Sequence, residues 1–246
     1  MRSAFRVAQT LSLACGLLLS AGCLLDRLYE TRHQLCSGEF QTQIMDGVRI
    51  TLRHPTLSDR DVICIVGVAP QETVSPDIKI ITYVAKRRSD MASSVDQIPI
   101  TLKFVMLDGV YKLQEGHIDK NLAAIVSAPL IVQGIKSACT AKLSLVRRSI
   151  EVPLEIDREL LPSRTAVIEA LGTPDSEDAA TRSLIYEYAV ASDMRHIARI
   201  AAYFDPSWSE IQRVDVSYLG HRFNADLSER RAVVTGGGNW GCALRL

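Results

Sequence analysis

The stretches SDRDVICIVG at residues 58–67 and SRTAVIEALG at residues 163–172 decide the predicted fold, because they share one pattern 105 positions apart (58 to 163). Each begins with serine, which caps helix N-termini, and ends with glycine, which favours the backbone found just after a helix. In between, apolar residues recur at the spacing of one helix face. A proline follows each stretch, at Pro70 and Pro174. The pattern predicts two short helices that are copies of each other.

Strands are predicted on both sides of each helix. Ahead of the first helix, residues 40–45 and 48–52 flank Asp46-Gly47, a dipeptide typical of tight hairpin turns. Ahead of the second helix, residues 141–146 and 150–156 form a similar pair, and apolar residues alternate along the latter. Three more strands are expected behind each helix, at 78–85, 100–107 and 110–118 in the first half and at 184–190, 197–204 and 211–218 in the second.

The sequence therefore predicts an α+β fold of two repeated ββαβββ units, with short helices packed on antiparallel sheets. The expected segments are a lipoprotein signal peptide at 1–22, a lipidated tether at 23–35, a first repeat at 36–118, a linking helix at 119–138, a second repeat at 139–221 and a flexible C-terminal tail at 222–246. The tail is expected to be mobile because it is rich in arginine and glycine.

The N-terminus has the features of an export signal. Arg2 and Arg6 precede an apolar stretch that is too short for a stable membrane span, and small residues follow it. The sequence Leu-Ser-Ala-Gly-Cys at 19–23 resembles the lipobox of bacterial lipoproteins, which implies that Cys23 is lipidated and becomes the first residue of the mature chain. Leu24 after that cysteine implies the outer membrane. A plain signal peptide and an uncleaved anchor are the alternatives.

Four cysteines remain in the exported chain: Cys36, Cys64, Cys139 and Cys242. An even number in an oxidising compartment predicts two disulfides, for which three connectivities are possible. Buried free thiols are the alternative. Cys64 occupies the position equivalent to Glu169 in the other helix, which predicts that its side of the helix faces solvent. No free thiol is expected in the mature protein.

The second unit resembles the SmpA/OmlA family of small BamE-like outer-membrane lipoproteins. The features that carry the resemblance are Leu171-Gly172-Thr173-Pro174, the tyrosines Tyr186 and Tyr188, the run 202–205 and the run 214–216. The resemblance covers about 162–219, and more loosely 56–118, and it implies a compact, non-catalytic domain of the envelope assembly machinery. The tandem arrangement is also similar to β-lactamase-inhibitory-protein architecture, which is a protein-binding scaffold.

Motifs for catalysis are lacking in the sequence. It contains no nucleophile elbow, phosphate-binding loop or zinc-protease helix. The five histidines lack ligand spacing, and with 28 basic and 28 acidic residues the chain has no field that would attract nucleic acid. The basic pairs Arg87-Arg88, Arg147-Arg148 and Arg230-Arg231 are expected in solvated turns or, alternatively, against anionic headgroups. No catalytic residue, cofactor or metal is predicted.

These observations favour one class of function. The expected protein is a non-catalytic scaffold or interaction module that is lipid-anchored in the outer membrane, faces the periplasm and binds an envelope protein partner. A small-ligand or lipid-binding envelope protein and an envelope hydrolase of unrecognised type are the alternatives.

Overall fold

A computed structural model describes residues 24, 26–66, 71–87, 97–120, 122–123, 127–144, 149–190, 197–218, 220–229 and 231–237. The predicted signal peptide, Cys23 and Cys242 therefore lie outside the described residues. Within the described part, no helix combines the length and the apolar content that crossing a bilayer requires.

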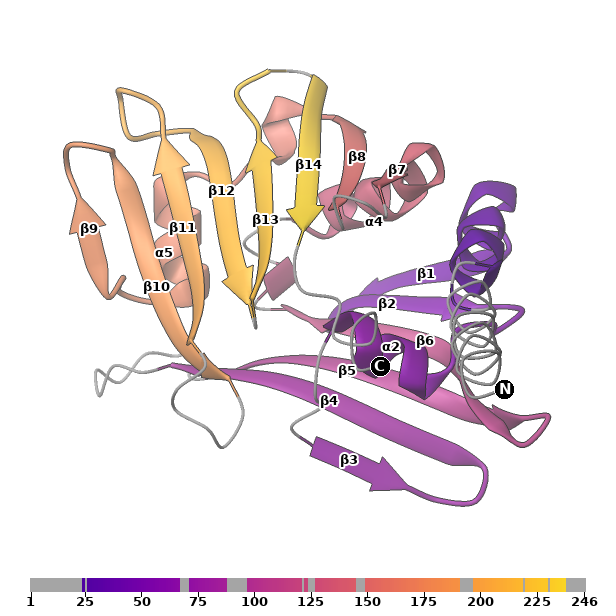
Figure 1. Ribbon diagram of the computed structural model, residues 1–246. Coiled ribbons are helices and arrows are strands. Elements are labelled where there is room, and N and C mark those ends of the chain that lie inside the picture. The colour runs from indigo at the N-terminus through magenta and orange to yellow at the C-terminus, as the bar shows by residue number, and fades with distance from the viewer. Residues whose placement is uncertain are drawn as a thin grey trace, which may run out of the picture.

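The described residues form fourteen strands in a single antiparallel sheet (Figure 1). The first half contributes β1 (Phe40–Met45), β2 (Gly47–Leu52), β3 (Gln71–Val74), β4 (Ile78–Arg87), β5 (Gln97–Leu107) and β6 (Val110–Asp119). The second half contributes β7 (Lys142–Ser144), β8 (Ser149–Glu155), β9 (Ser176–Asp178), β10 (Ser183–Val190), β11 (Ile197–Phe204), β12 (Ile211–Tyr218), β13 (His221–Asp226) and β14 (Arg231–Gly237). The strand order is β1-β2-β6-β5-β4-β10-β11-β12-β13-β14-β8-β7. In addition, β3 pairs with β4 and β9 with β10.

The predicted α+β fold of two repeated ββαβββ units is wrong. The sheet dominates the molecule and is continuous, because β4 of the first half pairs with β10 of the second over Arg87↔Tyr188, Lys86↔Ala189 and Ala85↔Val190. Sequence periodicity identifies strands but does not say which distant strands pair, so it suggested two sheets. Each half also contains an additional short strand, β3 or β9, ahead of its long strands.

Three short helices of the described chain lie on the sheet. They are α2 (Asp59–Val66), α4 (Ala128–Ser137) and α5 (Arg164–Leu171), with 3₁₀ turns η1 (Ala138–Thr140) and η2 (Arg158–Leu160). In Figure 1, α5 covers one face of the strands of the second half, and α2 lies against β5 and β6. Two apolar cores result, one around α5 with Val167, Leu171 and Tyr186, and one around α2 with Val62 and Phe104.

Both predicted helix starts are confirmed by their caps. Ser58 and Asp61 form a reciprocal capping box, with Oγ of Ser58 accepting from the Asp61 amide at 3.2 Å and the Ser58 amide donating to Asp61 at 2.8 Å. The hydroxyl of Ser163 accepts from the Ala166 amide in the same way. Gly172 ends α5 with φ of 75°, a backbone conformation that favours glycine.

The predicted flexible tail is instead part of the sheet over much of its length. Strands β13 and β14 form a hairpin that is inserted between β12 and β8. A side chain at Gly236 would place its Cβ 2.8 Å from Cδ1 of Phe223 and 3.1 Å from Cγ2 of Ile150. The glycine therefore allows two neighbouring strands to pack closely, and its presence does not indicate mobility.

The predicted tether is also ordered. Residues 26–37 form a helix that is docked on the body of the protein. Arg27 donates two hydrogen bonds of 2.7 Å to the carboxylate of Asp61, and the hydroxyls of Thr31 and Thr56 lie 2.7 Å apart. Leu28 packs against the core around α2. The helix 26–37 is therefore a fixed part of the fold.

The contact between Arg27 and Asp61 predicts a pH-dependent stability. Burial by itself would raise the pKa of the Asp61 carboxyl, but hydrogen bonds from Arg27 and Ser58 outweigh it and hold the pKa below its usual value of 3.8. The ionised Asp61 carboxylate therefore contributes its full stabilisation of the fold above about pH 4. This stabilisation is lost as the pH falls through the lower pKa that Asp61 has in the folded state. We expect Asp61→Asn to reduce the free energy of unfolding by about 1–2 kcal/mol at pH 7, because Arg27 is partly exposed.

Urea unfolding of the native chain and of Asp61→Asn between pH 2.5 and 7 measures this effect. The difference between the two proteins should shrink as the pH falls below 4. Arg27→Gln removes the same ion pair from the other side and should reproduce the difference at pH 7. A difference that stayed constant over the whole range would show that the ion pair does not contribute.

Candidate functional site

Two of the four predicted disulfide cysteines bond to each other. Cys36, near the end of the helix 26–37, is joined to Cys139 in η1, with their Cα atoms 4.8 Å apart. Strand β1 begins shortly after Cys36, and β7 shortly after Cys139. Because β1 and β7 are the two ends of the strand order, the disulfide connects the opposite ends of the sheet.

Cys64 is disulfide-bonded as well, and the other cysteine of that bond lies outside the described residues. The expectation that its side of the helix faces solvent is wrong, since Cys64 is only 6% exposed. Asp61, one turn earlier on α2, is held by Arg27, so the helix 26–37 covers this side of α2. A docked N-terminal helix could not be anticipated from the comparison with Glu169.

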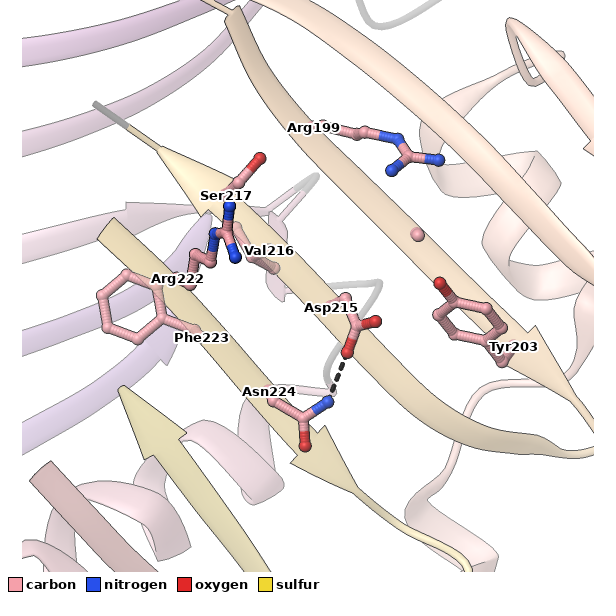
Figure 2. A pocket seen from close by; sticks show the side chains of 9 residues that line it. Arg199, Tyr203, Asp215, Val216, Ser217, Arg222, Phe223 and Asn224 are labelled. Carbon is pink, nitrogen blue, oxygen red and sulfur yellow. Dashed lines mark hydrogen bonds between the residues drawn. The ribbon is translucent and has the colours of Figure 1, made fainter. Parts of the chain in front are cut away.

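A groove of about 500 Å³ lies across β11, β12 and β13 (Figure 2). Its floor and walls come from three neighbouring strands, so the sheet fixes their relative positions. Ala201, in the middle of β11, has a small side chain that leaves the groove open between Arg199 and Tyr203. The lining residues are Arg199, Ala201, Tyr203, Asp215, Val216, Ser217, Arg222, Phe223 and Asn224.

Polar side chains on the floor of the groove are held by one another. Asn224 donates to the carboxylate of Asp215, to which it is paired in register across β12 and β13. Arg213 lies 3.5 Å from the same carboxylate and stacks over the ring of Tyr203, 3.9 Å from its centroid. Figure 2 shows Asp215 and Asn224 pointing toward each other, with Tyr203 at the end of the groove. The polar groups at this end of the groove therefore have their hydrogen-bonding and ionic partners within the protein.

At the other end, two arginines lack such partners. In the part of the chain that the structure describes, the guanidinium groups of Arg199 and Arg222 have no hydrogen bond or ion pair, and both side chains are exposed. Sequence reasoning missed them, because Arg222 fell in the predicted tail and Arg199 in an apolar strand. The alternation of Arg199, Ala201 and Tyr203 along β11 was the signal that could have found this face.

The outer edge of β1 is a second candidate site. Among the described residues, no strand pairs with this edge, which therefore presents free backbone donors and acceptors. The sequence of β1 is FQTQIM, without a charged residue, and Ile44 and Met45 are 55% and 82% exposed. A hollow of about 230 Å³ lies beside its end, lined by Gln43, Met45, Asp46, Gly47, Arg49 and His117.

The other strands with an open edge are shorter and carry charge. They are β3 with sequence QETV, β7 with KLS and β9 with SED. Short length and charged side chains are the usual devices that protect a sheet edge from pairing with another chain. Within the described residues, β1 is thus the edge strand that lacks this protection.

The shifted titratable groups are structural. Burial raises the pKa of Tyr83 and of Tyr188 to about 12, and both rings lie in apolar cores. Burial also lowers the pKa of His221. Asp205 caps a turn, where hydrogen bonds from Ser207 and from backbone amides hold its pKa far below the usual value. None of these groups lines the groove across β11, β12 and β13.

Among the described residues, no group of three or more histidine, cysteine, aspartate or glutamate side chains is placed to hold a metal ion.

The basic pair Arg87-Arg88 was expected in a solvated turn, and this expectation is wrong for Arg87, which is 7% exposed as a whole residue. The side chains of Arg88, Arg147, Arg148, Arg230 and Arg231 are outside the described part.

Comparisons of the chain with family models, with curated proteins and with solved structures found no match.

Proposed function

We propose that this protein is a non-catalytic interaction module of the bacterial cell envelope, which is anchored through a lipid on Cys23 and binds an extended segment of a partner protein along β1. The observation that carries the proposal is the uncharged edge of β1, with which no other described strand pairs. A partner strand that adds to such an edge gains main-chain hydrogen bonds, while hollows beside the strand select its side chains. The hollow lined by Gln43 and Met45 is placed for this selection.

The position of β1 fits a partner near the membrane. The helix 26–37 begins three residues after Cys23 and ends three residues before β1. Because this helix is docked through Arg27, a lipid on Cys23 would hold β1 at a short and defined distance from the bilayer. The resemblance to SmpA/OmlA outer-membrane lipoproteins supports the same compartment and class of function.

Site-specific photo-crosslinking in cells tests the proposal. A photoreactive residue in place of Gln41 on β1 is expected to give an adduct with another envelope protein, whereas one in place of Gln71 on the charged edge β3 is not. Ile44→Lys adds a charge to the β1 edge and should abolish the adduct, because a desolvated lysine opposes strand addition. Val74→Lys is the matched control, since Val74 is similarly exposed at 58% on β3.

Other results would count against the proposal. If two copies of this chain were crosslinked to each other, the β1 edge would serve self-association, and the proposed binding of another protein would be wrong. An adduct that Ile44→Lys and Val74→Lys reduced equally would exclude β1 as the docking site. Cys23→Ala should release the protein from the membrane fraction, and unchanged membrane association would refute the lipid anchor.

A further inference from the structure

The disulfide of Cys64 on α2 has three possible partners within the chain. Cys64 is disulfide-bonded and only 6% exposed. The chain has six cysteines, of which Cys36 and Cys139 are bonded to each other. The cysteines that lie outside the described residues, and that remain as partners of Cys64, are Cys15, Cys23 and Cys242.

The proposed export of the protein leaves one of these three. Cys15 lies in the predicted signal peptide at 1–22, which is removed from the mature chain. A lipid on the sulfur of Cys23 occupies the atom that a disulfide would need. Cys242 is then the remaining partner for Cys64. This step rests on the proposed function, and in particular on the lipid anchor.

The end of β14 lies near the first half of the sheet. Gly237 ends β14 in the row that contains Arg222 and Ser217, so it lies two strand spacings, about 10 Å, from β12. Tyr218, the next residue on β12, packs against both apolar cores. Its ring centroid is 6.4 Å from that of Tyr83 in the core around α2. The last described residue before Cys242 is therefore close to the core that α2 covers.

The chain between Gly237 and Cys242 is long enough to reach α2. Five residues span up to about 17 Å when extended. This length is comparable with the path from the end of β14 through Tyr218 and Tyr83 to α2. In Figure 1, β14 runs toward the first half of the sheet, where α2 lies. A bond from Cys242 to Cys64 therefore requires no change in the described fold.

Cys23 is the competing partner of Cys64. Asp61 precedes Cys64 by one helical turn, and it is held by Arg27 of the helix 26–37. Cys23 is four residues before Arg27 in the sequence. In a chain without the lipid, the thiol of Cys23 would thus be a second thiol within reach of Cys64. The two partners exclude each other, so the state of Cys23 has to be measured together with the disulfide.

We propose that Cys64 and Cys242 form a disulfide in the mature lipoprotein and tie the C-terminal segment 238–246 to α2. Each thiol loses one proton and one electron, and both electrons pass to a disulfide-bearing thiol oxidant of the compartment, which is reduced to its dithiol. Because β14 is paired within the second half and α2 belongs to the first, the bond joins the two halves covalently. It would act together with the bond between Cys36 and Cys139.

Tryptic digestion of the full lipidated chain without reduction, followed by mass spectrometry, tests the proposal. Residues 61–79 should be recovered joined to residues 232–245, because arginine or lysine flanks both segments. The positive control is the bond in the structure, which joins residues 33–49 to residues 137–142. Reduction should separate both pairs. In the denatured, unreduced chain, Cys242→Ser should leave one reactive thiol, on 61–79. Cys36→Ser is the matched variant and should leave one on 137–142.

The state of the segment 23–27 separates a failure of this disulfide from a failure of the lipid anchor. A free thiol on 61–79, beside a lipidated segment 23–27, would overturn the disulfide and leave the anchor in place. Residues 61–79 joined to 23–27 would overturn both, since a lipidated sulfur cannot form that bond. Residues 61–79 joined to 232–245, beside an unlipidated Cys23, would support the disulfide and refute the anchor alone.

Discussion

Replacing Arg87 with alanine is expected to lower the free energy of unfolding by about 3–5 kcal/mol, as is typical when one member of a buried charged network is removed. The side chain is 2% exposed and reaches from β4 of the first half into the second half. It donates to the carbonyl of Leu171 at 2.5 Å and to that of Thr173. It also lies 3.4 Å from the carboxylate of Asp175.

The tyrosines around Arg87 add to this cost. Its guanidinium lies 5.0 Å from the ring centroid of Tyr186 and 5.9 Å from that of Tyr188. Alanine would leave a cavity between the two rings and would leave the carbonyls at the end of α5 without their donor. Because β4 and β10 pair over only three residues, the Arg87 side chain is a main connection between the halves.

Chemical denaturation followed by circular dichroism measures this loss. Lys86→Ala, at the exposed neighbouring position, is the matched control and should change the free energy of unfolding by less than about 0.5 kcal/mol. Arg87→Lys keeps the charge but not the planar fork and should fall between the two. If Arg87→Ala were as stable as Lys86→Ala, the two halves would be held together by the β4–β10 pairing and the Cys36–Cys139 disulfide without help from Arg87.

Removal of the Cys36–Cys139 disulfide is expected to have a similarly large effect. The bond closes a loop with a sequence separation of 103. In the chain-entropy model, a crosslink of that span restricts the unfolded chain enough to stabilise the fold by about 5 kcal/mol. For a domain of this size, the loss corresponds to a decrease of about 10 °C in melting temperature. Both cysteine side chains are at least partly exposed, so the substitution itself removes little packing.

Comparison of the double variants Cys36→Ser/Cys139→Ser and Cys36→Ala/Cys139→Ala tests the stabilisation attributed to the disulfide. Equal losses of melting temperature in the two would assign the effect to the covalent bond, since serine and alanine differ in polarity. Thiol labelling of the denatured, unreduced native chain should detect neither cysteine. If both double variants melted at the native temperature, the disulfide would not contribute to the stability of the fold.

Local signals in the sequence predicted local structure well. The serine caps of α2 and α5 were identified because an N-cap serine accepts a hydrogen bond from the backbone amide three positions later. Gly172 was identified because few other residues adopt its backbone conformation. The hairpin at Asp46-Gly47 and the strands around both helices were recognised from alternation and turn chemistry.

Features that depend on distant residues could not be predicted. Nothing near Arg87 indicates that it would be buried between two tyrosines from the other half. Gly236 suggested mobility because the packing of Phe223 against it depends on the pairing of β13 with β14. The groove was missed for the same reason, since its lining residues on β11, β12 and β13 are brought side by side only by the strand register.

The disulfide between Cys36 and Cys139 also determines how the protein would bear mechanical load. With the chain anchored through Cys23 as proposed, tension from the bilayer reaches Cys36 through the helix 26–37 and passes to Cys139 along the shortest covalent path. The intervening loop, which includes β1 to β6, lies outside that path. Covalent tension between the membrane and the second half would therefore bypass β1 to β6 and would reach the first half only through the contacts that dock the helix 26–37.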